Sequence, residues 1–225
     1  MKTLLESWRG FLADGIESSS DIEQHFTSTE LEAIKAWAGL SGDGKHLGTA
    51  TMGSAYQFGD KVLKITKDLS EAHAAATLIG DEHPNVYKIY AVGRLPDRDQ
   101  WVIISELLMP SDREMYFAAK EMYNKRKIKE DYYSWKGIGS LSQEEQKILN
   151  SLVSFAPMGL DKEQIKQYVD QIATGLTYLA SKGITFTDIK PSNIMNKDGQ
   201  AAIIDVGRAG VKEYAGIPEI SLDSL

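Results

Sequence analysis

The chain has 225 residues, of which 42% are hydrophobic and 25% are charged, as in an ordinary globular protein. Its formal net charge of −7 argues against a protein whose main work is to coat nucleic acid, so no nucleic-acid partner is expected. Cysteine is absent, which excludes a disulfide framework and thiolate metal sites. The apolar runs are far shorter than a membrane span, and the first residues lack a secretory pattern. We therefore expect no membrane partner and a cytoplasmic location.

Residues 1–44 are predicted to form an N-terminal helical segment. A second helix within it should begin at the capping box Thr27-x-x-Glu30, in which the two side chains cap each other's backbone N–H groups. The first helix is indicated by apolar residues that recur on one face, namely Leu4, Leu5, Trp8, Phe11 and Leu12.

Residues 45–108 differ in pattern, with glycines and short strand-like runs that predict a small sheet holding one helix. The predicted elements are strands within 45–66, a helix over 71–79 that Ser70 caps, strands over 86–93 and 101–107, and a hinge at Met109-Pro110.

Residues 109–225 carry mainly helical patterns. The predicted elements are helices that open at Ser111-x-x-Glu114 and Ser142-x-x-Glu145, a helix over 161–182 that Gly183 ends, and short strands over 193–196 and 201–204.

The strongest chemical signal is the run Thr187-Asp-Ile-Lys-Pro-Ser-Asn-Ile-Met195, which Ile204-Asp-Val-Gly207 follows. Asp188 and Asn193 lie on one loop, and Asp205 comes later across a tight hairpin. Two strands folded back on each other bring these three oxygen ligands to one place, and Mg²⁺ prefers such ligands. Phosphoryl transfer needs metal ions that neutralise phosphates and a carboxylate that orients the attacking hydroxyl.

These motifs resemble the catalytic loop and the metal-binding motif of eukaryotic-type serine/threonine protein kinases. The resemblance implies that Asp188 orients and deprotonates the substrate hydroxyl and that Lys190 steadies the transferring γ-phosphate. It also implies that Asn193 and Asp205 bind Mg²⁺. The alternative is a polar turn and an Asp-Gly bend in an unrelated α/β protein.

The segment from Gly48 to Ser54 stands where this family has its glycine-rich phosphate loop. The resemblance implies that Gly48, Gly53 and Ser54 bind the nucleotide, because glycines let backbone N–H groups approach a polyphosphate closely. Ala50 replaces the middle glycine of the family pattern, and an ordinary β-hairpin is the alternative.

Lys64, in Val62-Leu-Lys64, matches the strand lysine that contacts the α- and β-phosphates in this family. The solvated face of a strand is the alternative explanation. The family pairs this lysine with a helix glutamate. Glu71 is the preferred candidate, although it lies only seven residues after Lys64, and Glu82 is the reserve.

The run from Ile103 to Leu108 resembles the hinge strand of the family. Ser105 then stands at the gatekeeper position, and the backbone of Glu106 and Leu108 faces adenine. A plain buried strand that ends at a loop accounts for the same residues.

The resemblance implies an α+β, protein-kinase-like two-lobe fold with a small antiparallel-sheet N-lobe and a reduced helical C-lobe. We expect a single kinase-like domain over residues 1–225, made of the helical segment 1–44, the N-lobe 45–108 and a minimal C-lobe 109–225.

The chain departs from the family at two places. Phe186 and Thr187 stand where most protein kinases have His-Arg, and that arginine normally holds a phosphorylated activation loop. Few residues follow Gly207, so the usual activation segment has little room. We therefore expect a minimal kinase, of the kind known from bacteriophages and bacterial effectors, that is active without prior phosphorylation.

The leading functional hypothesis is an ATP- and Mg²⁺-dependent serine/threonine protein kinase that transfers the γ-phosphate to a protein hydroxyl. The protein substrate is a host protein, in the host cytoplasm, if the chain comes from a phage or an effector. A small-molecule kinase of the aminoglycoside phosphotransferase type stays open, because it needs no peptide platform, whereas Lys190 and Pro191 favour a protein kinase. A pseudokinase that acts as a binding module is the third hypothesis. Its signature is loss of a catalytic group, yet all the key positions are filled, namely Lys64, Asp188, Asn193 and Asp205.

Overall fold

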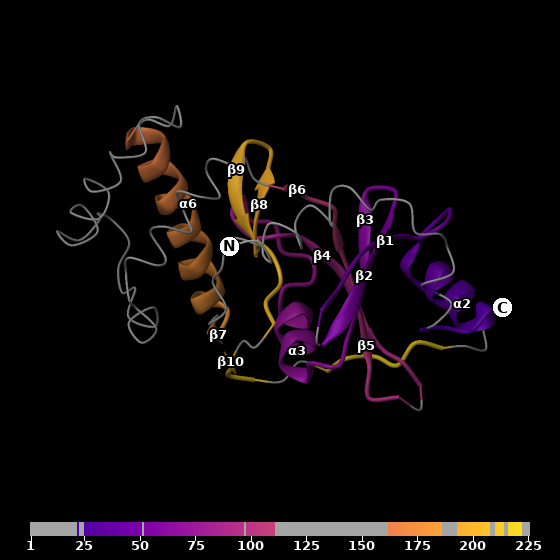
Figure 1. Ribbon diagram of the computed structural model, residues 1–225. Coiled ribbons are helices and arrows are strands. Elements are labelled where there is room, and N and C mark those ends of the chain that lie inside the picture. The colour runs from indigo at the N-terminus through magenta and orange to yellow at the C-terminus, as the bar shows by residue number, and fades with distance from the viewer. Residues whose placement is uncertain are drawn as a thin grey trace. The chain divides into compact units, whose positions relative to one another are not determined.

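The computed structural model (Figure 1) describes the fold in two compact units. The sheet unit comprises Met1–Gly80, Ile89–Leu107 and Ala215–Leu225, and the α6 unit comprises Asp81–Lys88 and Leu108–Tyr214. The helices predicted over 1–12 and within 111–156 lie outside the described residues. The structure describes residues 22, 25–50, 52–96, 98–110, 162–185, 193–207, 210–213 and 216–221.

The sheet unit is built on a five-stranded sheet in the order β1-β2-β3-β5-β4, in which all neighbouring strands are antiparallel. The antiparallel sheet predicted from the sequence is therefore confirmed. Gly59 adopts a φ of 60°, which permits the tight turn between β2 and β3. The strands are β1 (Lys45–Ala50), β2 (Gly53–Phe58), β3 (Lys61–Thr66), β4 (Ile89–Arg94) and β5 (Trp101–Glu106).

Helix α2 (Ser28–Ala38) covers one face of this sheet. It begins at the predicted capping box of Thr27 and Glu30 and ends at Gly39, whose left-handed φ of 59° closes the last turn. The helix and the sheet share an apolar core. Its buried members are Ile22, Phe26, Ile34, Leu40, Tyr56, Phe58, Leu63, Ile65, Leu95, Val102, Ile104 and Ile220.

A segment late in the chain, residues 216–221, adds to the β4 edge of the same sheet. The Arg94 N–H donates to the Pro218 carbonyl at 2.8 Å, and the Ile220 N–H donates to the Arg94 carbonyl at 2.9 Å. Ile220 is only 1% exposed. Gly93 makes room for it, since a Cβ at Gly93 would lie 2.6 Å from Ile220 Cγ1. The segment thus completes the core on the α2 side.

Helix α3 (Leu69–Thr77) lies on the opposite face from α2 (Figure 1). The sequence predicts that Ser70 caps this helix, and that prediction is wrong. Asp68 is the N-cap, and its Oδ1 accepts the N–H groups of Ser70 and Glu71 at 2.9 and 3.3 Å. The helix therefore begins two residues earlier than predicted, almost directly after β3. Asp68 is the cap because its short side chain reaches the N–H groups of both Ser70 and Glu71. The Ser70 hydroxyl instead donates to Asp68 Oδ1.

The α6 unit contains the hairpin of β8 (Ile194–Lys197) and β9 (Gln200–Ile203), against which α6 (Lys162–Ser181) packs. Met109 and Pro110, suggested by the sequence as a hinge, form the short strand β6 on the edge of β8. Strand β7 (Ile184–Thr185) pairs with β10 (Gly210–Val211). In the parts of the chain that the structure describes, no helix has the length and apolar character of a membrane span.

Replacing Ile220 by alanine should destabilise the sheet unit by about 2–4 kcal/mol, because the deletion leaves a cavity in a closed apolar core. Ile79→Ala is the matched control, since Ile79 is 44% exposed. Urea unfolding followed by tryptophan fluorescence measures both variants. Equal midpoints for the two variants would show that segment 216–221 does not contribute to this core.

Candidate active site

The sheet unit brings Lys64 and Glu71 together. Lys64 Nζ on β3 forms an ion pair with Glu71 Oε1, in the first turn of α3. The second carboxylate oxygen, Oε2, accepts a hydrogen bond of 2.8 Å from the Thr66 hydroxyl. Glu82, the reserve candidate, pairs instead with Lys88 within the α6 unit. The structure thus places Glu71, not Glu82, beside Lys64.

Burial of the two partners differs in a way that suits phosphate binding. The Glu71 side chain is 2% exposed, whereas that of Lys64 is 23% exposed. A buried carboxylate is stabilised only when cations and hydrogen-bond donors satisfy its oxygens. Lys64 and Thr66 supply such groups here. The lysine ammonium group meanwhile keeps a partly accessible side on which it can meet an anionic ligand.

The predicted phosphate loop lies at the turn between β1 and β2. Residue 51 is outside the described part of the chain, and Gly48 lies beside an irregularity in β1. A Cβ at Gly53 would stand 1.8 Å from the Ile65 carbonyl oxygen. Glycine at position 53 is therefore required by the close approach of β2 and β3, whether or not a nucleotide binds.

The side chain of Ser54 lies on the α2 face of the sheet. Ser54 is 2% exposed, and its hydroxyl is hydrogen-bonded to Thr49 Oγ1 at 3.0 Å and to His25 Nε2 at 3.3 Å. Lys64 points to the other face, because it contacts Glu71 on α3. Any nucleotide contact made beside Lys64 by Ser54 must therefore come from its backbone N–H.

The predicted adenine-binding residues lie where the chain leaves the sheet unit. Glu106 ends β5 opposite Lys61, and the Leu107 N–H donates to the Asp60 carbonyl at 2.9 Å. Ser105, at the predicted gatekeeper position, is buried on β5. Leu108 is the first residue of the α6 unit after this crossing.

The α6 unit holds Asn193 and Asp205 at one end of the β8–β9 hairpin. The Ile204 N–H donates to the Asn193 carbonyl at 2.8 Å, so the ladder continues past β9 to the residue before Asp205. Asn193 is 4% exposed. Asp188 and Lys190, the predicted catalytic residues, lie outside the described residues.

Asp205 has an unusual backbone, with φ of +59°. Its Oδ1 accepts the Gly207 N–H at 3.1 Å, a local bond that makes the left-handed conformation tolerable for aspartate. Non-glycine residues with positive φ are uncommon and gather at functional sites. Among the described residues, Asp205 shares this conformation with Asp198, which lies in the β8–β9 turn.

The donors at this hairpin end fit Mg²⁺. Asp205 offers a carboxylate oxygen and Asn193 an amide oxygen, and Mg²⁺ is often held by one or two carboxylates together with substrate phosphates. Among the described residues there is no cluster of three or more His, Asp or Glu side chains arranged to hold a metal. A Mg²⁺ ion at Asn193 and Asp205 would therefore need phosphate oxygens or water to complete its shell.

Asn85 holds this hairpin in place, a role that the sequence analysis missed. Its Nδ2 donates to the Ala201 carbonyl at 2.9 Å, and its own carbonyl accepts the Ile203 N–H at 2.9 Å. Gly175 on α6 lies against it, since a Cβ there would stand 2.5 Å from the Asn85 carbonyl oxygen. The only signal in the sequence is an Asp-Glu-His-Pro-Asn turn, which resembles any polar loop.

A second set of polar contacts fixes the same segment to the end of α6. Asp81 Oδ2 accepts hydrogen bonds from Lys182 Nζ and from the Tyr178 hydroxyl, both at 2.7 Å. Both hydrogen bonds lower the pKa of Asp81, and the one from Lys182 has the larger effect. The hydrogen bond to Asp81 raises the pKa of Lys182, and burial raises the pKa of Tyr178. His83 stacks on Tyr178 at 4.3 Å, and burial lowers the pKa of its imidazole.

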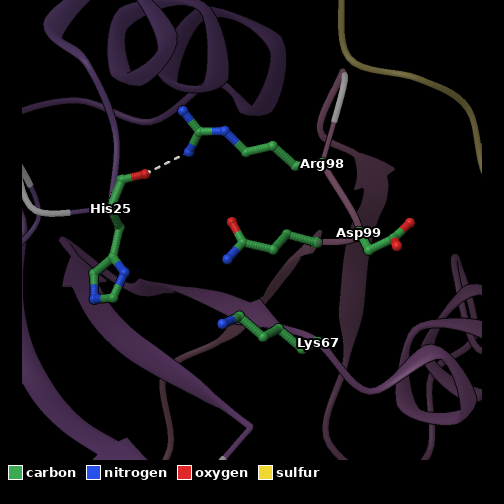
Figure 2. Close-up of a pocket in the computed structure, with 5 residues that line it drawn as sticks. His25, Lys67, Arg98 and Asp99 are labelled. Carbon is green, nitrogen blue, oxygen red and sulfur yellow. Dashed lines mark hydrogen bonds between the residues drawn. The ribbon is translucent and has the colours of Figure 1, made fainter.

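The sheet unit carries an open hollow of about 440 Å³, lined by His25, Lys67, Arg98, Asp99 and Gln100 (Figure 2). The hollow contains none of the residues predicted to act in catalysis. Its Arg98 guanidinium already donates to the His25 carbonyl at 2.8 Å and pairs with Glu30 at 2.7 Å. Arg98 is therefore engaged within the protein, and Lys67 is the other cation that lines the hollow.

Comparison with known proteins gives the family of the chain. A family model described as the protein kinase domain matches residues 60–216, well over half of the chain. The chain therefore belongs to the protein kinase family. The family inferred from the motifs, and its α+β fold class, are confirmed.

Individual relatives match over short segments. The chain is 36% identical to serine/threonine-protein kinase CHK1 of Mycosarcoma maydis over 59 residues, which is 26% of this chain and 9% of that protein. It is 42% identical to serine/threonine-protein kinase NLK2 of Xenopus laevis over 62 residues, which is 27% of this chain and 14% of that protein. The matched segments thus span less than a sixth of either relative.

The Asp81 contacts predict a pH-dependent stability. Because the folded-state pKa of Asp81 lies below its ordinary value of 3.8, its ionised form stabilises the folded chain above about pH 4. This contribution is lost as the pH falls through the lowered pKa. Asp81→Asn should therefore unfold at lower urea concentration than the wild type at pH 7, and the gap should narrow below about pH 4.

Asp99→Asn serves as the control, because the Asp99 side chain is 95% exposed. Its urea midpoint should follow the wild type throughout the pH range. A gap between Asp81→Asn and the wild type that is constant from pH 7 to pH 3 would show that the carboxylate charge of Asp81 is not what stabilises the contact.

Proposed function

We propose that this chain is an ATP- and Mg²⁺-dependent serine/threonine protein kinase, which transfers the γ-phosphate of ATP to a protein hydroxyl. The observation that carries the proposal is the pairing of Lys64 with the buried Glu71, in a chain of the protein kinase family. A structural role alone does not require a buried carboxylate next to a lysine that is partly accessible. The relatives named above support the protein substrate, since both are called serine/threonine-protein kinases.

The sheet unit supplies the nucleotide-binding groups in this proposal. Lys64 binds the α- and β-phosphates while Glu71 fixes its ammonium group. Backbone N–H groups of the β1–β2 turn, at Gly48, Gly53 and Ser54, approach the phosphates. The backbone of Glu106 and Leu108 binds adenine.

The α6 unit supplies the metal ligands in this proposal. Asn193 and Asp205 hold Mg²⁺ through an amide and a carboxylate oxygen. When bound, the ion neutralises charge on the phosphates and so makes the γ-phosphorus open to attack. The buried position of Asn193 and the local bond of Asp205 to Gly207 hold the two ligands in place before the ion arrives.

In this proposal the chemical step is carried by Asp188 and Lys190, which lie in the sequence between β7 and β8. The substrate hydroxyl oxygen attacks the γ-phosphorus, and the bond from that phosphorus to the β–γ bridging oxygen breaks, so that ADP leaves. Asp188 orients the hydroxyl and accepts its proton. Lys190 donates to the γ-phosphate oxygens and steadies them during the transfer.

The proposal is tested by transfer of labelled γ-phosphate from ATP in the presence of Mg²⁺. The acceptors are the chain itself, generic proteins such as casein, and small alcohols including aminoglycosides. Transfer to serine or threonine of a protein supports the proposal. Transfer only to small alcohols identifies a small-molecule kinase, and binding of Mg·ATP without transfer to any acceptor identifies a pseudokinase.

Asp188→Asn should remove phosphotransfer while leaving Mg·ATP affinity nearly unchanged, because the carboxylate acts on the hydroxyl and not on the nucleotide. The expected loss in kcat is roughly 10²- to 10⁴-fold. Rapid-quench turnover and fluorescent-nucleotide titration measure the two quantities. A variant that retains turnover close to the wild type would remove Asp188 from its proposed role.

Asp205→Asn should weaken Mg·ATP binding about tenfold or more, because it removes the charge from a metal ligand. Asparagine is chosen since it tolerates positive φ and keeps the acceptor for the Gly207 N–H. Asp198→Asn is the matched control, because Asp198 also has positive φ, 51°, but lies at the opposite end of the hairpin. Nucleotide titrations with and without Mg²⁺ measure the affinity of each variant. If both variants bind Mg·ATP like the wild type, Asp205 is not a metal ligand.

A further inference from the structure

We propose that Thr66 is a positioning residue that keeps Glu71 on Lys64 by occupying the hydrogen-bonding place where a capping box would otherwise capture this glutamate. The role of the pair in catalysis rests on the proposed function. The hydrogen-bond arrangement itself does not, and it is open to a separate test.

Helix α2 shows a complete capping box in this chain, whose glutamate also pairs with Arg98 through its other oxygen, Oε1. Thr27 is the N-cap, and Glu30 stands three residues later. The Thr27 N–H donates to Glu30 Oε2 at 2.7 Å, and the Glu30 N–H donates to Thr27 Oγ1 at 3.2 Å. The carboxylate of Glu30 thus folds back onto its own cap, as in capping boxes generally.

Helix α3 has the same spacing but a different outcome. Asp68 is the N-cap, and Glu71 stands three residues later with its N–H on Asp68 Oδ1. Here the Asp68 N–H donates to Thr66 Oγ1 at 3.0 Å, and the same hydroxyl donates to Glu71 Oε2 at 2.8 Å.

The Thr66 hydroxyl therefore stands between the cap and the glutamate. A hydroxyl can accept and donate at once, and Thr66 does both. It satisfies the cap N–H and, at the same time, holds Oε2 on the side of β3. The other oxygen, Oε1, is left in contact with Lys64 Nζ. Lys64 and Thr66 are alternate residues on one strand, so their side chains leave the same face of the sheet.

Burial makes the hydroxyl hard to replace. Thr66 is 0% exposed and Glu71 is 2% exposed, so solvent has little access to the bond between them. Without the hydroxyl, the Asp68 N–H loses its acceptor and Glu71 Oε2 loses a donor. A direct bond between these two groups restores both losses, and α2 shows that this geometry forms in the same chain. Forming it draws the Glu71 carboxylate toward the cap and away from Lys64.

The functional experiment compares three variants. Thr66→Val removes the hydroxyl at nearly constant volume and should lower kcat/KM for Mg·ATP about tenfold, as expected for loss of a hydrogen bond to a charged group. Thr66→Ser keeps the hydroxyl and should stay within about threefold of the wild type. Thr77→Val, at the far end of α3, removes a hydroxyl that donates to the His73 carbonyl, and should leave kcat/KM unchanged.

A double-mutant cycle separates positioning from simple destabilisation. If Thr66 acts through Glu71, Thr66→Val should cause no further loss in a Glu71→Gln background. Additive losses would overturn the proposal, as would equal activity of the valine and serine variants. If Thr66→Val does not fold, Thr66→Ala replaces it in the same cycle.

The arrangement is tested without any turnover by crystal structures of the wild type and of Thr66→Val. The expected change is a Glu71 carboxylate hydrogen-bonded to the Asp68 N–H and separated from Lys64. A carboxylate that stays on Lys64 in the variant overturns the inference. If the wild type transfers no phosphate, the proposed function fails, and this structural comparison still decides the role of Thr66.

Discussion

The buried carboxylate of Glu71 is the constraint on which the α3 side of the sheet unit depends. A carboxylate that is 2% exposed is costly unless charged and hydrogen-bonding partners surround it. Lys64 and Thr66 on β3 provide those partners, and the cap of α3 follows them within two residues. The helix contributes mostly alanines to its buried face, which bury little apolar area. Polar contacts at the β3–α3 junction therefore contribute much of what fixes the start of α3 on the sheet.

The opposite face of the same sheet is held by a different force. There α2 and segment 216–221 cover an apolar core, and the glycine at position 93 allows Ile220 to reach it. Strand β3 serves both faces at once, because its side chains alternate. Leu63 and Ile65 enter the core, while Lys64 and Thr66 face α3. Because the apolar core on the α2 face fixes β3 in the sheet, the α3 face of the same strand can hold the Lys64–Glu71 pair at a defined place.

The sequence predicted the parts of this molecule whose signals are local. The strand position of Lys64, the β8–β9 hairpin before Asp205, the capping box of α2 and the antiparallel strands are each visible within a few residues. It missed the parts that depend on contacts between distant segments. Ile220 sits in a short run without periodicity, so nothing marks it as core. Asn85 looks like a loop residue until β9 is placed beside it. Ser54 was predicted to bind the nucleotide. Only the fold shows that its side chain lies on the opposite face of the sheet from Lys64. The prediction that Ser70 caps α3 was wrong because Asp68, which the sequence analysis did not consider, suits the same role and lies closer to the end of β3.

The closeness of Lys64 and Glu71 in the sequence also bears on control. Closing a contact over seven residues costs little chain entropy, so the pair forms with the junction itself. A regulatory switch needs an element with two arrangements of similar free energy. Moving Glu71 away from Lys64 as a rigid part of α3 breaks two further bonds together, the one from the Thr66 hydroxyl to Glu71 and the one from the Asp68 N–H to Thr66. An ion pair built in this way is assembled whenever the sheet unit is folded. In the kinase proposed above, control then acts on what reaches the site, namely nucleotide, metal ion or acceptor, and not on the formation of the pair.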